Sequence, residues 1–337
     1  MNEMQGAPKA KPLVSVVIIF LNAKRFIREA IDSVLHQSYD HWELILVDDG
    51  STDESTRIAQ SYAGLMPSKI RFLEHPGHSH RGMSASRNLG IRSGSGELIA
   101  TLDSDDVWPP RKLEEQVEIM FAHPEVDMVY GRTIAWQTWS GNTKKIRRDI
   151  LYPYRLQPDR VYQPPDLLAN MLRGITQAPS MSNVLFRRLA FDQTRGFVDS
   201  FAGAFEDGVF MAKLLIGQKV FFSGSVWDRY RIHPESSSSI MIKQGVWYPE
   251  RLKYLTWVGE FVSQSRLGGG QVRDALRVAL RAHRRSVLLR FARPLHRFRS
   301  WMSLFYRPGE TLTVEAGNVR IRNPFARGGS DWPPENT

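Results

Sequence analysis

The sequence contains no cysteine among its 337 residues. This absence excludes a disulfide framework, a thiolate nucleophile and a thiolate metal site, and it fits a reducing compartment. Long hydrophobic runs are absent as well. The longest, Leu13 to Leu21, is interrupted by Ser15 and is far shorter than the ~20 residues that span a bilayer. Because Met1 to Pro12 also lacks the apolar core of a signal peptide, we expect a cytoplasmic protein.

Acidic residues are scarce in one segment in particular. The stretch from Gln271 to Arg307 holds ten arginines against a single acid, Asp274, so that it carries +9 of the chain's net charge of +10. The overall content of 42% hydrophobic and 24% charged residues is ordinary for a globular protein of one large domain or two smaller ones. The basic segment therefore needs a local explanation.

Strand and helix patterns alternate through the first 135 residues. Leu13–Phe20 is a β-branched run typical of a strand buried on both faces, and Trp42–Val47 is similar. Alternating strands and helices predict a mostly parallel, Rossmann-type α/β sheet with flanking helices and ligands at its carboxyl edge. Further strands are expected at 70–73, 98–102 and 126–135, and helices after Asn22, at 84–92, from Pro109 to about Phe121, and after Ser51, where Glu54 completes a capping-box spacing.

The rest of the chain has weaker patterns. We expect the tail after Pro308, rich in glycine and proline, to be poorly ordered. Strands are expected at 181–186, 220–222 and 226–231, and helices at 207–215, 248–265 and 271–291.

Two adjacent carboxylates, Asp48 and Asp49, end the second expected strand and precede a glycine and Ser51. One interpretation is a strand-to-helix turn in which Asp and Ser side chains act as caps. It explains Gly50 and Ser51, but it does not explain two neighbouring acids, whose repulsion is costly without a partner. The alternative is that a carboxylate here accepts a base N–H group or a ribose hydroxyl.

Three acids in four positions, Asp103, Asp105 and Asp106, follow the strand that ends at Leu102. A divalent cation such as Mg²⁺ or Mn²⁺ relieves such a concentration of charge, because it takes oxygen ligands and bridges phosphate oxygens. Asp103 and Asp105 are two residues apart, so in an extended chain they point to the same side. We favour a metal–diphosphate site here over a capping loop.

Four segments occur in order: Val-Ser-Val-Val-Ile-Ile-Phe-Leu-Asn (14–22), Val-Asp-Asp-Gly-Ser-Thr-Asp (47–53), Ser-Ala-Ser-Arg-Asn-Leu-Gly (84–90) and Leu-Asp-Ser-Asp-Asp (102–106). Together they resemble the family 2 glycosyltransferases, which are inverting, nucleotide-sugar-dependent enzymes of the GT-A fold. The resemblance covers about residues 13–135 well and 180–240 more loosely. One departure is Ile-Phe-Leu-Asn at 19–22, where many members have Pro-Thr-Tyr-Asn.

The resemblance implies a set of donor-site residues. Asp49 would contact the nucleotide base, and we place Asp48 beside it in the same site. Asp103 and Asp105 would form the DxD motif that touches ribose and metal, with Ser104 between them. Arg87 and Asn88 would lie next to the donor.

The resemblance also implies catalytic and metal-binding residues in the second half. Glu206 and Asp207 precede an expected helix, where capping and catalysis fit the sequence equally well until the family pattern is considered. That pattern implies Asp207 as the general base, with Glu206 in reserve, because a carboxylate within reach removes the proton of an acceptor hydroxyl. A lone histidine beside proline is more often a turn residue. The aromatic-Arg-x-His pattern at 230–233, however, implies a loop that closes over the donor, with His233 as a third metal ligand beside Asp105 and Asp103.

Other candidate residues receive a structural interpretation. His75, His78 and His80 are expected to form a polar loop. For most of the aromatic residues that could stack on a sugar, a core role is the default; these are Trp136, Trp139, Tyr152, Tyr154 and Tyr162.

We therefore expect transfer of a single sugar from a UDP- or GDP-sugar to an acceptor hydroxyl, with Mn²⁺ or Mg²⁺, in bacterial polysaccharide or glycolipid biosynthesis. The Gln/Arg-x-x-Arg-Trp signature of processive relatives is absent, which favours one sugar per encounter. The partners would be the nucleotide-sugar donor and a glycan or lipid-linked acceptor. The expected segments are a flexible N-terminus (1–12), a nucleotide-sugar-binding half (13–135), an acceptor and catalytic-base half (136–240), a basic helical extension (241–307) and a flexible tail (308–337).

Two other classes of protein remain as alternatives. A nucleotidyltransferase would be expected to carry a glycine-rich phosphate loop with a lysine near the N-terminus, whereas Ile19–Arg28 has no glycine. A non-enzymatic protein that binds anionic membranes or nucleic acid through its basic arm would leave the acidic clusters unexplained. It also lacks any recognised nucleic-acid motif.

The basic arm itself allows two main interpretations. Val272, Leu276, Ala279 and Val287 lie at helical spacing beside a run of arginines. This apolar stripe could pack on the catalytic domain, or it could enter a membrane interface, with the arginines of 271–307 on anionic head groups at the inner face of the cell membrane. Nucleic acid ranks third and is not expected as a partner, because aromatic residues are not interleaved at base-stacking positions.

Overall fold

The computed structural model describes residues 11–140, 148–201, 204–265, 267, 269–292, 312–315 and 318–321. Nine of its strands form one mixed sheet in the order β3-β2-β1-β4-β8-β5-β9-β7, with β6 paired to β5. These strands are β1 (Val14–Phe20), β2 (Trp42–Asp48), β3 (Ile70–Glu74), β4 (Leu98–Asp103), β5 (Met128–Trp136), β6 (Ile150–Leu151), β7 (Arg160–Tyr162), β8 (Leu185–Arg187) and β9 (Val220–Arg231).

The strands of the sheet mostly run in one direction. The first four, β3, β2, β1 and β4, are parallel neighbours. Strand β8 runs antiparallel to both β4 and β5, so β5 and its parallel neighbour β9 point the same way as β4. The carboxyl ends of β1, β2, β4, β5 and β9 therefore share one edge. The predicted mostly parallel α/β sheet is confirmed, and strands from both halves of the chain belong to it.

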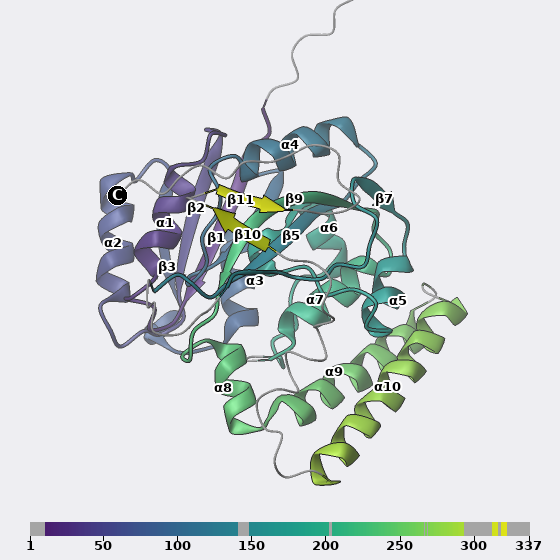
Figure 1. Ribbon diagram of the computed structural model, residues 1–337. Coiled ribbons are helices and arrows are strands. Elements are labelled where there is room, and N and C mark those ends of the chain that lie inside the picture. The colour runs from purple at the N-terminus through teal and green to yellow at the C-terminus, as the bar shows by residue number, and fades with distance from the viewer. Residues whose placement is uncertain are drawn as a thin grey trace, which may run out of the picture.

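Helices cover both faces of the sheet (Figure 1). Every residue of β1 is buried, and its alternate residues belong to two separate cores. Val16 and Ile18 join a core with α1, α2 and α4, while Val17 and Ile19 join a core with α3, α5, α6, α7, α9 and α10, as the two-residue period of a strand requires. The α-helices are α1 (Ile27–Leu35), α2 (Ser55–Leu65), α3 (Met83–Ser93), α4 (Lys112–Ala122), α5 (Asp166–Leu172), α6 (Arg188–Thr194), α7 (Glu206–Leu215), α8 (Ser237–Gln244), α9 (Trp247–Gln264) and α10 (Gly269–Ala292), and two 3₁₀ helices are η1 (Pro76–His78) and η2 (Met181–Asn183).

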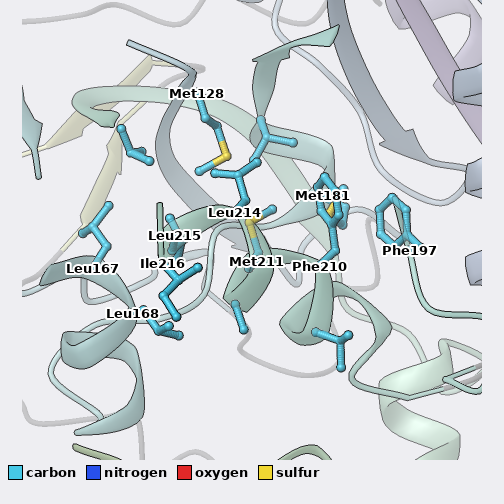
Figure 2. Close-up of a cluster of buried hydrophobic side chains, with 14 of the residues drawn as sticks. Met128, Leu167, Leu168, Met181, Phe197, Phe210, Met211, Leu214, Leu215 and Ile216 are labelled. Atoms are coloured by element: carbon cyan, nitrogen blue, oxygen red, sulfur yellow. The ribbon is translucent and has the colours of Figure 1, made fainter. Parts of the chain in front are cut away.

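Helix α7 lies at the centre of the second core. Phe210, Met211 and Leu214 are fully buried and pack among Met128 of β5 and Leu168 of α5 (Figure 2). Full burial of a side chain of this size stabilises the fold by about 1.5–3 kcal/mol. The packing therefore fixes the position of α7, whose first two residues are Glu206 and Asp207.

Helices α9 and α10 extend the second core away from the sheet (Figure 1). In α10, Val272, Leu276 and Ala279 are buried in this core. The interpretation that the apolar stripe packs on the domain is confirmed for these residues, and insertion of the stripe into a membrane is wrong for them. Val287 is half-buried, and residues 293–307 lie outside the described part. Among the described residues, no helix is long and apolar enough to cross a membrane.

Several predicted boundaries differ from the structure. The first helix begins at Ile27 rather than after Asn22, because Asn22 has a left-handed φ of 52° and its side chain accepts hydrogen bonds from Thr52. The capping box after Ser51 is wrong, since the Ser51 hydroxyl accepts the Asn22 N–H instead. The predicted strand 181–186 is the 3₁₀ helix η2 followed by β8, and the strands 220–222 and 226–231 are the single strand β9.

The tail after Pro308 was expected to be poorly ordered. Its described residues form two short antiparallel strands, β10 (Leu312–Glu315) and β11 (Asn318–Ile321). The remaining residues of the tail, and residues 1–10 of the predicted flexible N-terminus, lie outside the described part.

Candidate active site

The carboxyl edge of the sheet brings together acids that are far apart in the sequence. Asp103 ends β4, Asp105 lies in the turn that follows, and His233 lies just beyond β9. Glu206 and Asp207 begin α7 and reach the same region through Arg87 of α3. The structure thus assembles most of the predicted site residues around one edge of the sheet.

Arg87 joins two of these acids. Its Nη2 donates to Asp103 Oδ1 at 2.8 Å, and its Nη1 donates to Glu206 Oε1 at 2.7 Å. Burial lowers the pKa of the Arg87 guanidinium, but the carboxylates of Asp103 and Glu206 outweigh burial and raise it. The arginine therefore stays charged, and its rigid fork fixes the spacing between the acid after β4 and the acid at the start of α7.

Asp207 lies beside this pair and is differently placed. Asp207 is half-buried, and its Oδ1 accepts a hydrogen bond from the Gly208 N–H at 2.6 Å. Burial, followed by the neighbouring charge of Glu206, raises the pKa of Asp207 from 3.8 to about 7. A carboxyl group with such a pKa accepts a proton readily near neutral pH. Glu206, in contrast, is buried and bound to Arg87.

Asp105 and His233 form a second cluster, which the sequence predicted as a metal site. The His233 Nε2 lies 2.8 Å from Asp105 Oδ2, and the His233 Nδ1 lies 3.1 Å from Glu235 Oε2. Burial lowers the pKa of His233, but the hydrogen bonds with Asp105 and Glu235 outweigh burial and raise it. A carboxylate that holds the second ring nitrogen is the usual support of a metal-binding histidine.

Asp105 and His233 suit a divalent cation whose other ligands are oxygen atoms of a substrate. No group of three or more Asp, Glu or His side chains in the described part of the chain is arranged to hold a metal ion. The other predicted ligand, Asp103, is bound to Arg87. Magnesium and manganese sites that use phosphate oxygens need only one or two protein ligands. Asp105 and His233 therefore suit such a site, whereas the three-ligand set with Asp103 is not assembled.

A buried network that the sequence analysis did not assign holds the turn after β4. Asp106 is fully buried, its Oδ2 accepts from the Ser182 hydroxyl at 2.6 Å, and its Oδ1 accepts from the Arg231 N–H at 2.9 Å. The Ser182 hydroxyl also accepts the Asp103 N–H. The sequence shows Asp106 only as one acid of the cluster, and nothing in the sequence near Ser182 signals this role.

Arg231 and three aromatic rings complete the wall beside His233. The Arg231 side chain is buried and donates to the Asp105 carbonyl at 2.7 Å and to Glu29 Oε2 at 2.7 Å. Its guanidinium lies over the rings of Phe26, Trp136 and Trp139, at 4.8, 4.4 and 5.2 Å from their centroids. Stacking of this kind suits arginine and would not be reproduced by lysine. In the sequence, this role of Arg231 is indicated by its position two residues before His233.

Asp49 directly follows β2 and is buried against the start of α3. Its Oδ1 accepts the Arg81 N–H at 2.7 Å, and the Gly82 N–H bonds to both carboxylate oxygens. The His80 Nδ1 lies 2.9 Å from Asp49 Oδ2, and the His80 side chain is 61% exposed. Among these partners, His80 is the one that a ligand could displace without disturbing the backbone.

Two predicted donor-site residues have structural roles instead. Asp48 is fully buried, and its carboxylate accepts from the Ser51 N–H and the Thr56 hydroxyl, so it stabilises the turn between β2 and α2. Asn88 bonds through its side chain to the backbone of Phe197 and to Asp199, so it fixes the loop after α6. The polar atoms of both side chains therefore already have partners inside the protein. Ser104 lies in the turn between Asp103 and Asp105 and is partly buried.

The remaining histidines and aromatic residues mostly keep their structural interpretation. His75 bonds to Ser86, and His78 bonds to Glu74 and to the Ser51 carbonyl, as expected for a polar loop. Tyr154 is buried in the core beside Tyr130 and Phe222. Trp136 and Trp139 are exceptions, because they border the cluster that contains His233.

Residues 15–195 match the profile of the family described as "Glycosyl transferase family 2". Two provisionally named glycosyltransferases of Bacillus subtilis (strain 168) are similar: EpsE, at 39% identity over 118 residues (35% of this chain), and the teichuronic acid biosynthesis protein TuaG, at 41% identity over 111 residues (33% of this chain). The chain spans 42% of the length of each of these relatives.

Solved structures show the same fold. The S. aureus TarS 1–349 structure in complex with UDP-GlcNAc has a TM-score of 0.61 and 17% identity, covering 79% of this chain and 71% of that chain. The mannosyltransferase PcManGT from Pyrobaculum calidifontis, in complex with GDP-Man and Mn²⁺, has a TM-score of 0.55 and 17% identity, covering 90% of this chain and 87% of that chain. Both likenesses confirm the predicted GT-A-like fold.

Proposed function

Since this chain belongs to glycosyl transferase family 2, we propose that it transfers a single sugar from a nucleoside diphosphate sugar to an acceptor hydroxyl, with inversion at the anomeric carbon. The observation that carries the proposal is the bridge from Asp103 through Arg87 to Glu206, with Asp207 beside it. Such a bridge would hold an acid suited to the donor at a fixed spacing from an acid suited to the acceptor.

The donor diphosphate would bind at the turn after β4. Asp105 and His233 would hold Mn²⁺ or Mg²⁺, which neutralises the charge that develops on the departing diphosphate. Glu235 holds the Nδ1 of His233 and so orients Nε2 towards Asp105. Support comes from the complex of PcManGT with GDP-Man and Mn²⁺, although that likeness concerns the fold alone.

The nucleoside would lie between β1, β2 and α3. An N–H group of a uracil or guanine base would replace His80 at Asp49, because His80 is the exposed partner of that carboxylate. Asp103, with Ser104, would contact the ribose, since the Asp103 carboxylate uses Oδ1 for Arg87 and its side chain is 29% exposed. Asp48 and Asn88 have no part in this proposal.

Asp207 would act as the general base. As the acceptor oxygen attacks the anomeric carbon from the face opposite the diphosphate, its proton passes to the Asp207 carboxylate. The pKa of about 7 suits this transfer near neutral pH. Glu206 is less suited because its Oε1 is bound to Arg87. A single displacement of this kind inverts the anomeric configuration, by the same logic as in inverting glycosidases.

The acceptor would be a glycan or a lipid-linked saccharide of bacterial polysaccharide or glycolipid synthesis. The name of TuaG, which refers to teichuronic acid biosynthesis, supports the polysaccharide class. No observation on the described residues favours the nucleotidyltransferase or nucleic-acid alternatives.

Release of nucleoside diphosphate from a panel of UDP- and GDP-sugars, with and without Mn²⁺, tests the proposal. We expect metal-dependent release with one donor, increased by a saccharide acceptor and lost in Asp207→Asn. The matched control is Asp192→Asn, which neutralises an exposed carboxylate of α6. Equal release by wild type and Asp207→Asn would overturn the assignment of the base, and absence of release from every donor would overturn the proposed activity.

A further inference from the structure

The first turns of α9 lie beside the last turns of α10, next to α8 (Figure 1). Residues of both helices line an apolar groove there. It encloses about 810 Å³ and is distinct from the carboxyl edge of the sheet. Its lining includes Tyr248, Leu252, His283, Arg284, Val287 and Leu288.

The groove exposes hydrocarbon to water. Leu252 is 44% exposed and Leu288 is 70% exposed, and Val246, just before α9, is 38% exposed. Apolar surface costs about 25 cal/mol for each Å² that stays in water. Exposed leucines gathered on one groove, rather than scattered singly, are typical of a site that binds an apolar partner.

His283 gives a second indication of a ligand. This histidine lines the groove, is 4% exposed, and its Nδ1 is buried without a hydrogen-bond partner among the described residues. Burial, together with the charge of Arg251, lowers the pKa of His283, which favours the neutral ring. A buried polar atom left unpaired costs about 1–3 kcal/mol. A polar group of a ligand in the groove would remove this cost.

The charge beside the groove indicates the chemistry of the partner. Arg273, Arg277, Arg281 and Arg285 follow one another at a spacing of four residues and are exposed, and Arg284 lines the groove itself. Like charges at this spacing on a helix are destabilising by a few tenths of a kcal/mol per pair. A row of cations that ends at an apolar groove complements an amphiphile with an anionic head group and a hydrocarbon chain.

We propose that the groove and the arginine row bind an anionic phospholipid of a membrane surface. One hydrocarbon chain enters between Leu252 and Leu288, and the phosphate group lies against Arg284. This differs from insertion of the whole α10 stripe, because Val272, Leu276 and Ala279 remain buried in the protein.

The groove lies near the acceptor side of the candidate active site. Trp247, next to Tyr248 in α9, contacts Phe205 with ring centroids 6.0 Å apart, and Phe205 directly precedes Glu206. If the proposed function holds, docking at the groove brings a lipid-linked acceptor close to Asp207. Lipid binding itself does not depend on sugar transfer.

Sedimentation of the full chain with vesicles tests the proposal without a donor or an activity measurement. We expect binding to vesicles of phosphatidylcholine mixed with phosphatidylglycerol, weakening at high salt, and no binding to phosphatidylcholine alone. Leu252→Asp and Leu288→Asp should each weaken binding about ten- to a hundredfold, since burial of a leucine contributes about 1.5–3 kcal/mol. Both side chains are exposed, so these variants should keep the wild-type unfolding temperature, which is measured alongside.

Matched controls separate the groove from general charge and hydrophobicity. Leu189→Asp removes a leucine of α6 that is 64% exposed, and it should bind like wild type. Arg284→Glu should weaken binding, whereas Arg57→Glu, the same charge change on α2, should not. Equal losses in the controls, or full binding by both leucine variants, would overturn the proposal. We would also compare the full chain with a variant that ends at Ala292. If only the shortened variant binds vesicles, the C-terminal residues cover the groove, and the proposal is overturned.

Discussion

Replacement of Asp207 by asparagine should make the protein inactive and more stable at the same time. Burial and the charge of Glu206 raise the pKa of Asp207 from 3.8 to about 7. Because the folded-state pKa lies above the unfolded-state value, this carboxyl group costs stability when it is ionised. The cost appears as pH rises from about 4 to 7 and is complete above pH 7.

The size of the effect follows from the pKa difference. About three pKa units correspond to about 4 kcal/mol of destabilisation above pH 7. Contact of the half-buried Asp207 with water reduces this cost, so we expect Asp207→Asn to be more stable than wild type by about 1–4 kcal/mol at pH 8. Near pH 4 the two proteins should be about equally stable, since the asparagine and the protonated carboxyl are both neutral.

Urea unfolding of metal-free protein at about pH 4, 5.5, 7 and 8 measures the difference. Transfer activity, followed as diphosphate release, should fall by about two to four orders of magnitude in the same variant. Asp192→Asn, which changes an exposed carboxylate, should show no such pH-dependent gain. A constant stability difference between wild type and Asp207→Asn at all four pH values would refute the reasoning, because the carboxyl would then titrate alike in the folded and unfolded states.

Three further changes test other parts of the site. Asp105→Ala should nearly abolish transfer and the Mn²⁺-dependent thermal stabilisation by UDP or GDP while the unfolding temperature of the free protein is retained; wild-type turnover would refute the metal assignment. Arg87→Met should lower the free energy of unfolding, measured by urea unfolding, by about 3–5 kcal/mol, because Asp103 and Glu206 lose their shared cation. A decrease of less than about 1 kcal/mol would contradict the bridge. Gly50→Ala should lower the unfolding temperature, because Gly50 has a φ of 88° and an added Cβ would lie 2.9 Å from the backbone nitrogen of His80. Gly64→Ala in α2, with open space around it, should be neutral or stabilising by up to about 1 kcal/mol.

The sequence predicted the sheet well because its signal is local. Continuous β-branched runs identify β1 and β2, and the acids after β2 and β4 indicate the edge where ligands bind. The roles of neighbouring acids were harder to predict. Asp48 and Asp49 are adjacent, yet Asp48 caps its own turn and Asp49 reaches the backbone at 81–82.

Residues with partners far along the chain account for most of the errors. Ser51 has the spacing of a helix cap, but the N–H of Asn22, 29 residues earlier, captures its hydroxyl. Asn88 faces the loop at 197–199, more than 100 residues later, and Ser182 reaches Asp103 and Asp106 across the sheet. A local pattern carries no information about such partners, since they are set by the way the sheet is assembled.

The order of strands in the sheet has a consequence for synthesis of the protein on the ribosome. Strands β1 to β4 can pair as soon as residue 103 has emerged, but β4 then forms one open edge of this four-stranded unit, with β3 at the other. The free side of β4 is later covered by β8, which begins at Leu185. Strand β5 reaches these strands only through β8. An unpaired edge strand readily pairs with another chain. Nascent chains that stop between residues 103 and 185 should therefore aggregate through β4, while chains that extend past β9 should not.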